Sequence, residues 1–146
     1  MTIAIDGPAG AGKSTVAKRL AKILNVAYLD TGAMYRALTL KALRQHIDLN
    51  NEGKLVELAR KTKLDLKNCP EGVKIFLDGE DVSEEIRNHK VTNNTFYIAQ
   101  APKVREIMVQ WQRRLGEKQS LVAEGRDIGT VVFPNASYKF YLDADL

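Results

Sequence analysis

A glycine-rich loop near the start of the chain constrains the fold more than any other feature. The run Thr2 to Asp6 is apolar with β-branched residues and predicts a buried strand, and a helical repeat of apolar residues begins just after Ser14. The residues between them fit the pattern G-x-x-x-x-G-K-[ST] at every fixed position and read Gly7-Pro8-Ala9-Gly10-Ala11-Gly12-Lys13-Ser14. A strand, this loop and a helix in that order predict a site for phosphate groups.

The chemistry of the loop follows from its residue types. Glycines let the backbone fold closely around oxygen atoms, while backbone N–H groups and the positive end of a helix neutralise phosphate charge. We expect Lys13 to reach the β- and γ-phosphates of a nucleoside triphosphate as a catalytic residue, and the Ser14 hydroxyl to bind Mg²⁺. The predicted nucleotide-binding residues are Gly7, Pro8, Ala9, Gly10, Ala11, Gly12, Lys13, Ser14 and Thr15.

The order of the predicted elements indicates an α/β protein. Strand-like runs occur at Val26 to Leu29, Leu121 to Ala123 and Lys139 to Leu142. Asp30-Thr31-Gly32 predicts a turn and a helix cap before a second helix. Because strands alternate with helices, we predict a P-loop NTPase-type parallel sheet flanked by helices, with ligands gathered at the carboxyl ends of the strands.

The middle of the chain predicts a small α+β insertion. A short helix is predicted after Asn51, and strands are predicted at Leu64 to Leu66 and Val73 to Leu77. Asp78-Gly79 is typical of a tight hairpin turn because both residues tolerate positive φ, which indicates a short antiparallel patch. A further amphipathic helix is predicted after Pro102, since proline suits the first turn of a helix.

Composition and charge exclude several classes of protein. The chain has 146 residues, of which 45% are hydrophobic and 27% charged, and no stretch approaches the ~20 apolar residues of a membrane span. Its start lacks the basic region and apolar core of a signal peptide, and Cys69 is the only cysteine, so we expect a cytoplasmic protein. The 22 basic and 18 acidic residues give a net charge of +4 that is spread over helix faces, so we expect no nucleic-acid surface.

Arginine and aspartate side chains elsewhere in the chain are candidates for a second substrate. Arg36 lies one turn into the second predicted helix, where a forked guanidinium suits a phosphoryl acceptor. Arg126 and Asp127 follow a predicted strand at the same edge of the sheet, and Arg105 lies on the helix after Pro102. From the residues alone each has an ordinary alternative: a surface arginine, a structural ion pair and a solvated helix face.

Together these residues resemble those of the bacterial cytidylate kinases, which pass the γ-phosphoryl group of ATP to CMP or dCMP. The resemblance covers the whole chain and rests on four blocks in order, Ile5 to Thr15, Leu29 to Arg36, Leu77 to Ser83 and Gly125 to Pro134. It implies a single kinase domain with a core at about 1–35 and 101–146 and an acceptor-nucleotide insertion at about 36–100. The sequence does not determine the oligomeric state, and a monomer is expected for the complete protein.

The resemblance also implies roles for the acceptor residues. Arg36 and Arg126 are expected to hold the acceptor phosphate, with Arg126 also catalytic, and Thr31 is expected to bind substrate. Arg105 and Asp127 are expected to read cytosine. Cytosine offers an exocyclic amine to a carboxylate, while its ring nitrogen and carbonyl accept from an arginine. Uracil has a carbonyl in place of the amine, so an ionised Asp127 disfavours it.

The sequence departs from the family pattern in two places. Phe96 stands where the family often has a serine that touches cytosine, and the sequence ends at Leu142 to Leu146, so we expect the family's arginine-rich lid and its final strand and helix to be absent. Two other functions stay open: a P-loop kinase of another small acceptor, and a nucleotide-binding fragment without catalysis. A panel of acceptors distinguishes the first, and ATP binding without product formation distinguishes the second.

Overall fold

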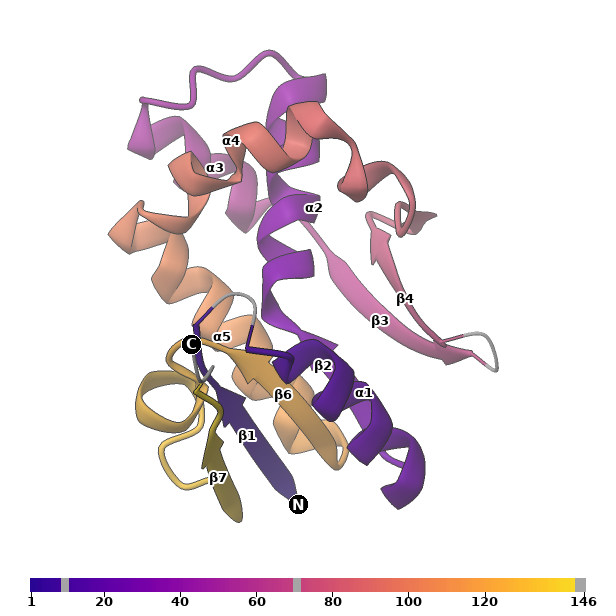
Figure 1. Cartoon of the computed structure of the whole chain (residues 1–146). Coiled ribbons are helices and arrows are strands. Elements are labelled where there is room, and N and C mark those ends of the chain that lie inside the picture. Colours follow the sequence, from indigo (N-terminus) through magenta and orange to yellow (C-terminus); the bar gives the residue numbers. More distant parts are fainter. Residues whose placement is uncertain (9–10, 70–71, 144–146) are drawn as a thin grey trace. The chain divides into compact units, whose positions relative to one another are not determined.

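The computed structural model describes residues 1–8, 11–69 and 72–143 of a chain that divides into two compact units. The first unit comprises Met1–Thr31 and Gln112–Leu146, and the second comprises Gly32–Trp111. Figure 1 labels the helices and strands. Within the described residues, no helix combines the length and the apolar content needed to cross a bilayer.

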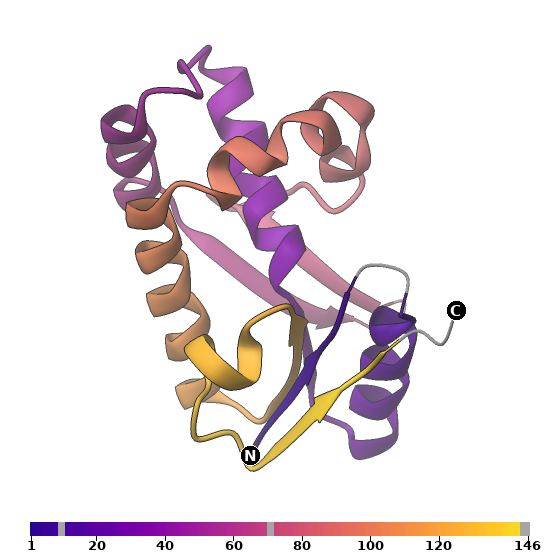
Figure 2. The same ribbon diagram turned by 60° about the vertical axis from the view of Figure 1, so that its left-hand side comes forward.

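The first unit is built on a four-stranded parallel sheet. Its strands lie in the order β2-β6-β1-β7, and Figure 2 shows β7 beside β1. All strand pairs are parallel, and the register sets Ile3 opposite both Val122 and Tyr138. The strands are β1 (Thr2–Asp6), β2 (Ala27–Asp30), β6 (Leu121–Gly125) and β7 (Tyr138–Tyr141). The predicted parallel sheet is therefore confirmed.

Burial explains the continuous apolar runs within β1 and β6. Ile3, Ala4 and Ile5 of β1 are between 0% and 3% exposed. Three successive residues of β6, Leu121 to Ala123, are buried as well. Parallel strands that are covered on both faces carry continuous apolar runs, whereas a half-exposed strand alternates. By contrast, all four residues of the edge strand β7 are exposed.

Helix α1 (Lys13–Leu24) contacts β2 and β6. Its buried residues are the small Ala17 and Ala21, which let the helix backbone approach the sheet closely. The helix ends at Asn25, which has a φ of 53° and donates its backbone N–H to the carbonyls of Ala21 and Lys22. A left-handed residue in this position is a common helix end.

The boundary between the two units falls within two helices, α2 (Thr31–Arg44) and α5 (Pro102–Lys118). The predicted turn at Asp30-Thr31-Gly32 is wrong, because β2 ends at Asp30 and α2 begins at the next residue. The Thr31 hydroxyl donates to the carbonyl of Glu124 in β6 at 2.9 Å. A hydrogen bond to the neighbouring strand thus holds the start of the helix where a turn was expected.

One turn of π-helix, η2 (Ile128–Val132), follows β6 in the first unit. Arg113 of α5 holds its end, because the guanidinium donates to the carbonyl oxygens of Val132 at 2.9 Å and Val131 at 2.7 Å. Carbonyl groups at the end of a helical turn have no partner within it, so a fork of cationic donors satisfies two of them at once.

The second unit contains a small antiparallel sheet with strand order β3-β4-β5. The turn between β4 and β5 is Asp78-Gly79, whose φ angles are 49° and 87°, as the hairpin prediction required. The predicted antiparallel patch is thus confirmed. The elements of this unit, besides the shared helices, are α3 (Glu52–Arg60), β3 (Leu64–Cys69), β4 (Gly72–Leu77), β5 (Glu80–Asp81), the 3-10 helix η1 (Glu85–Arg87) and α4 (His89–Ala99).

Helix α4 is not among the elements predicted from the sequence. Its centre, Thr92-Asn93-Asn94-Thr95, consists of residues with low intrinsic helix propensity. The Asn88 side chain accepts the backbone N–H of Val91 at 2.8 Å and so caps the helix start. Val91 and Ile98 are 1% and 0% exposed. Capping and burial of one face therefore outweigh propensity.

Candidate active site

The predicted phosphate-binding loop starts where β1 ends. Gly7 has a φ of 155°, and a Cβ atom added there would lie 2.3 Å from the carbonyl oxygen of Leu142. Leu142 is drawn close because its backbone N–H donates to the carbonyl of Asp6 at 2.8 Å. Packing alone therefore requires the first glycine of the loop. Ala9 and Gly10, two of the predicted phosphate-binding residues, lie outside the described residues.

The other end of the loop is the start of α1. Gly12 adopts the left-handed conformation with a φ of 81°, and the helix begins at Lys13. Among the described residues, no side chain caps this end, and the first turn carries no acidic residue. The first N–H groups of a helix have no partner within the helix, and together with the helix dipole they attract anions. The start of α1 thus suits a phosphate group.

Lys13 folds back over the loop. Its Nζ atom lies 3.4 Å from the carbonyl oxygen of Pro8. The ammonium group is therefore beside the loop backbone, which adds a positive charge to the same end of α1. Ser14 is half-buried and Thr15 is exposed on the next positions of the helix.

A buried chain of polar groups links α1, β2 and β6. Two of its members, Tyr28 and Glu124, are not among the site residues predicted from the sequence. The Ser14 Oγ atom lies 3.2 Å from the Tyr28 Oη atom, and the Tyr28 hydroxyl donates a short hydrogen bond to Oε1 of Glu124. Tyr28 and Glu124 are 7% and 5% exposed. The second carboxylate oxygen of Glu124 is buried and has no hydrogen-bond partner among the described residues. A buried oxygen without a partner is rare and marks a site where a ligand or water is expected.

The surroundings of Tyr28 keep its phenol protonated. Burial raises the pKa of Tyr28 above its ordinary value of 10.0, and the charge of Asp30 and the hydrogen bond to Glu124 raise it further. The Lys18 ammonium lies 5.8 Å from the centre of the Tyr28 ring, within the range of a cation–π contact. The phenol is therefore a hydrogen-bond donor at neutral pH.

A sequence signal for Glu124 exists in the strands themselves. β1, β2 and β6 are apolar but carry an acidic residue at their carboxyl ends, namely Asp6, Asp30 and Glu124. The register sets Asp30 opposite Glu124. An acidic residue at the end of a buried apolar strand needs a hydrogen-bond partner, because burying a carboxylate without one costs free energy. In a parallel sheet these acids gather at the edge where ligands bind.

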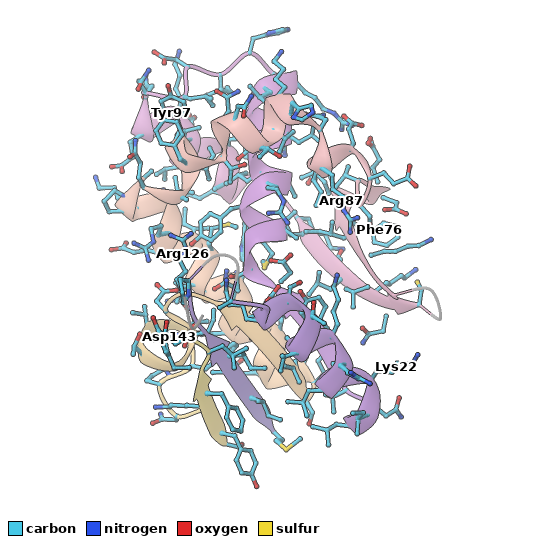
Figure 3. The ribbon with its side chains drawn as sticks, in the orientation of Figure 1. Lys22, Phe76, Arg87, Tyr97, Arg126 and Asp143 are labelled. Carbon is cyan, nitrogen blue, oxygen red and sulfur yellow. The ribbon has the colours of Figure 1, made fainter. Side chains whose placement is uncertain are left out.

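Asp6 positions the loop that follows β6. Its carboxylate oxygens accept the backbone N–H groups of Ile128 at 2.7 Å and Gly129 at 2.8 Å. Asp6 is 8% exposed, so these hydrogen bonds are shielded from water. Arg126 and Asp127 lie between the end of β6 and these two residues, and Figure 3 labels Arg126. The carboxylate thus fixes the main chain directly after both candidate acceptor residues.

The remaining acceptor candidates are divided between the units. Thr31, Arg126 and Asp127 belong to the first unit, as do Lys13 and Ser14. Arg36 on α2 and Arg105 on α5 belong to the second unit. An acceptor site that combines all of these residues draws on both units, so it stays a prediction.

The residues near Ser14 fit a magnesium ion that arrives with phosphate. The described residues contain no group of three or more His, Cys, Asp or Glu side chains placed to hold a metal ion. Mg²⁺ usually keeps several waters and takes only one or two protein oxygens together with phosphate oxygens. The Ser14 hydroxyl and Oε2 of Glu124, which has no hydrogen-bond partner among the described residues, are hard oxygen donors of this kind. This donor set therefore suits magnesium bound with a nucleotide.

The fold and the site define the class. A parallel sheet whose first strand leads through a G-x-x-x-x-G-K-S loop into a helix is the arrangement of the P-loop proteins, which bind nucleotide phosphates. Residues 3–146 match the family described as cytidylate kinase. The chain therefore belongs to the cytidylate kinase family.

Curated relatives with the same description support this membership. The chain is 57% identical to the cytidylate kinase of Caldanaerobacter subterraneus subsp. tengcongensis over 144 residues, which are 99% of this chain and 62% of that protein. It is 53% identical to that of Anoxybacillus flavithermus over 146 residues, or 100% and 65% of the two chains. It is 51% identical to that of Clostridioides difficile over 144 residues, or 99% and 65%. The chain thus spans just under two thirds of the length of these relatives.

Proposed function

We propose that the protein transfers the γ-phosphoryl group of ATP to CMP or dCMP, which gives ADP and CDP or dCDP. The observation that carries the proposal is the Gly7-to-Ser14 loop between β1 and α1, in a chain that belongs to the cytidylate kinase family. Relatives that are 57% and 51% identical to this chain are described as cytidylate kinases, which indicates the substrate pair.

The donor side of the reaction is assigned to the loop and the start of α1. The backbone N–H groups of the helix start and the Lys13 ammonium would neutralise the phosphate charge of ATP, as expected from the uncapped helix end. Ser14 is the residue assigned to Mg²⁺, and the ion would supply positive charge that screens the charge of the transferring group. These groups act by position and charge, and form no covalent bond with the phosphoryl group.

The acceptor side is assigned to the arginines. Arg126 and Arg36 would hold the phosphate of CMP through forked hydrogen bonds. An oxygen of that phosphate then attacks the γ-phosphorus, a new oxygen–phosphorus bond forms, and the bond between the γ-phosphorus and the bridging oxygen breaks as ADP leaves. The anchoring of the loop after β6 by Asp6 supports this role for Arg126, since a fixed backbone positions the side chain.

The base is assigned to Asp127 and Arg105. A carboxylate accepts the exocyclic amine of cytosine, and an arginine donates to the ring nitrogen and the carbonyl. Thr31 is also assigned to substrate binding, and its hydroxyl donates to the carbonyl of Glu124 in β6. This combination favours CMP and dCMP over UMP, because uracil presents an oxygen to the Asp127 carboxylate.

The test uses the protein expressed from its complete gene, in a coupled assay of ADP release with CMP as acceptor. Lys13→Ala should lower turnover by at least ~10²-fold, the scale expected for one preorganised charge-stabilising group. Lys22→Ala is the matched control, because Lys22 lies exposed in the last turn of the same helix, as Figure 3 shows. Turnover of Lys13→Ala within a few-fold of the unmutated protein would overturn the donor-site assignment.

A panel of acceptors in the same assay tests the substrate assignment. CMP and dCMP should be phosphorylated well ahead of UMP, because only cytosine matches the hydrogen-bond polarity of Asp127. Equal rates with UMP would contradict the assignment of Asp127 and Arg105. Transfer to a different small acceptor, or ATP binding without transfer to any acceptor, would contradict the proposed function itself.

A further inference from the structure

The hydrogen bonds between Ser14, Tyr28 and Glu124 can run in only one direction. A phenol has a single proton, and Tyr28 donates it to Oε1 of Glu124. The Tyr28 oxygen can therefore act only as an acceptor toward the Ser14 hydroxyl, which lies 3.2 Å away. Ser14 in turn must donate its one proton to Tyr28, so both lone pairs of its oxygen remain available.

This direction matters because a serine hydroxyl can meet a nucleotide in two ways. It can donate its proton to a phosphate oxygen, or it can offer a lone pair to a metal ion. Once the proton of Ser14 is directed to Tyr28, only the second way remains open. We propose that Tyr28 is a positioning residue that reserves the Ser14 hydroxyl for the metal ion. This inference rests on the proposed function, since it takes Ser14 as the metal-binding residue.

The anchors of Tyr28 are rigid enough for such a role. Its side chain is 7% exposed, and the Lys18 ammonium lies 5.8 Å from its ring centre. Glu124, which fixes the phenol proton, is 5% exposed, and its own carbonyl accepts the Thr31 hydroxyl at 2.9 Å. All of these residues except Glu124 belong to the Met1–Thr31 segment, and all lie in the first unit. A buried chain of hydrogen bonds in low dielectric holds its geometry better than an exposed one.

Tyr28→Phe removes the phenol oxygen and keeps the ring. The Ser14 proton then loses its acceptor and becomes able to turn toward a phosphate oxygen. The measured quantity is the magnesium gain, defined as the Kd of ATP in excess EDTA divided by the Kd of ATP in millimolar Mg²⁺, both determined by titration calorimetry without CMP. The gain should fall by about 2- to 10-fold in Tyr28→Phe, the range expected for one net hydrogen bond. The Kd in EDTA should stay equal or decrease.

Two further variants separate an effect through Ser14 from a general loss of structure. In a Ser14→Ala background, Tyr28→Phe should change the magnesium gain no further, because the group that Tyr28 orients has been removed. Glu124→Gln frees the Ser14 proton in another way, since an amide can donate to the phenol oxygen, and it should lower the gain when Ser14 is present. In the Ser14→Ala background Glu124→Gln should change the gain no further, which separates an effect through Ser14 from a direct contact between Glu124 and the metal ion. Tyr138→Phe is the control, because Tyr138 is 57% exposed on β7, and its gain should match the unmutated protein.

The outcomes distinguish this inference from the proposed function. The role of Tyr28 alone would be overturned by an unchanged gain in both Tyr28→Phe and Glu124→Gln. This holds when the gain is normal in the unmutated protein and reduced in Ser14→Ala. No gain in the unmutated protein, or an undiminished gain in Ser14→Ala, would overturn the assignment of Ser14 to the metal. If Tyr28→Phe does not melt cooperatively, Glu124→Gln with and without Ser14→Ala decides. An unchanged gain in Glu124→Gln, or an equal loss of gain in both backgrounds, overturns the inference.

Discussion

Asp6 and Glu124 are buried carboxylates that accept hydrogen bonds from uncharged groups. Asp6 accepts two backbone N–H groups of the loop after β6, and Glu124 accepts the phenol of Tyr28. A buried carboxylate is stable only when such hydrogen bonds replace those it loses to water. Both residues therefore tie a strand end to a neighbouring segment of the first unit.

Asp6→Asn tests the first of these connections. An amide offers only one acceptor oxygen, so its NH₂ group must face one of the two N–H groups that Asp6 accepts. The variant should lower the free energy of unfolding by about 1–3 kcal/mol, the cost of leaving a buried donor unsatisfied. Urea denaturation of both proteins measures the difference. The loop after β6, which carries Arg126, is then held less firmly. Because Arg126 is proposed to hold the phosphate of CMP, the KM for CMP should also rise.

Asp143→Asn is the matched control for this change. Asp143, which Figure 3 labels, is an exposed residue of the first unit and allows the same substitution. Exposed substitutions of this kind usually change stability by less than about 0.5 kcal/mol. If Asp6→Asn unfolds at the same urea concentration as Asp143→Asn, the two N–H groups do not depend on the Asp6 charge.

At the scale of elements, the β4–β5 turn of the second unit is tied to α2. The Lys41 ammonium lies 2.6 Å from Oδ2 of Asp78, and the backbone N–H of Lys63 donates to Oδ1 at 2.8 Å. Burial alone would raise the pKa of Asp78. The hydrogen bond from Lys41, the N–H of Lys63 and the charge of Lys41 outweigh it and hold the pKa below its ordinary value of 3.8.

The sign of this pKa shift predicts how stability depends on pH. A carboxylate whose pKa is lower in the folded state stabilises the protein fully above the unfolded value, and this contribution disappears as pH falls below 3.8. Asp78→Asn keeps a residue that tolerates the φ of 49°. It should lower the free energy of unfolding at pH 7 by less than about 1 kcal/mol, because the Asp78 side chain is 41% exposed. The difference in the free energy of unfolding between the variant and the unmutated protein should shrink as the pH falls from 5 to 3.

Asp65→Asn provides the comparison within the same sheet. Asp65 faces Lys63 at 3.7 Å, and both side chains are more than half exposed, at 52% and 77%. An exposed pair of this kind contributes little. Urea unfolding of both variants at pH 7 and pH 3 measures the effect. If Asp78→Asn lowers the free energy of unfolding by the same amount at both pH values, the ionic contribution of Asp78 is contradicted.

At the scale of the whole molecule, the two units differ in how the chain builds them. The second unit is continuous in sequence, Gly32–Trp111, whereas the first joins Met1–Thr31 to Gln112–Leu146. In the first unit β1 lies between β6 and β7, so the central strand pairs only with segments more than a hundred residues away. Its sheet can therefore form only after both ends of the chain have come together.

Hydrogen exchange with and without nucleotide tests where the donor site lies. At Mg²⁺-ATP concentrations about 100 times the Kd, openings of the first unit that destroy the site should be slowed by up to about 100-fold, because the ligand binds only the closed form. Amides of β1 and α1 should report this change, and those of β3 and β4 in the second unit should change much less. Lys13→Ala should abolish the difference at the same ATP concentration. Equal slowing in β3 and β4 would contradict a donor site confined to the first unit.

The sequence by itself determined the elements whose signals are local. The G-x-x-x-x-G-K-S loop predicted a strand before it and a helix after it, and both are present as β1 and α1. Asp78-Gly79 predicted its hairpin turn, because the positive φ of both residues is a property of the residues themselves. Family membership also followed from contiguous blocks, and residues 3–146 match the family.

Tertiary structure alone decided the features that depend on distant partners. Helix α4 forms despite weak propensity because Val91 and Ile98 are buried, and burial is a property of the folded chain. Thr31 starts a helix directly, where a turn was predicted, because its hydroxyl meets a carbonyl of β6. The chain from Ser14 through Tyr28 to Glu124 spans 96 residues between its last two members, and no local pattern encodes a hydrogen bond at that separation.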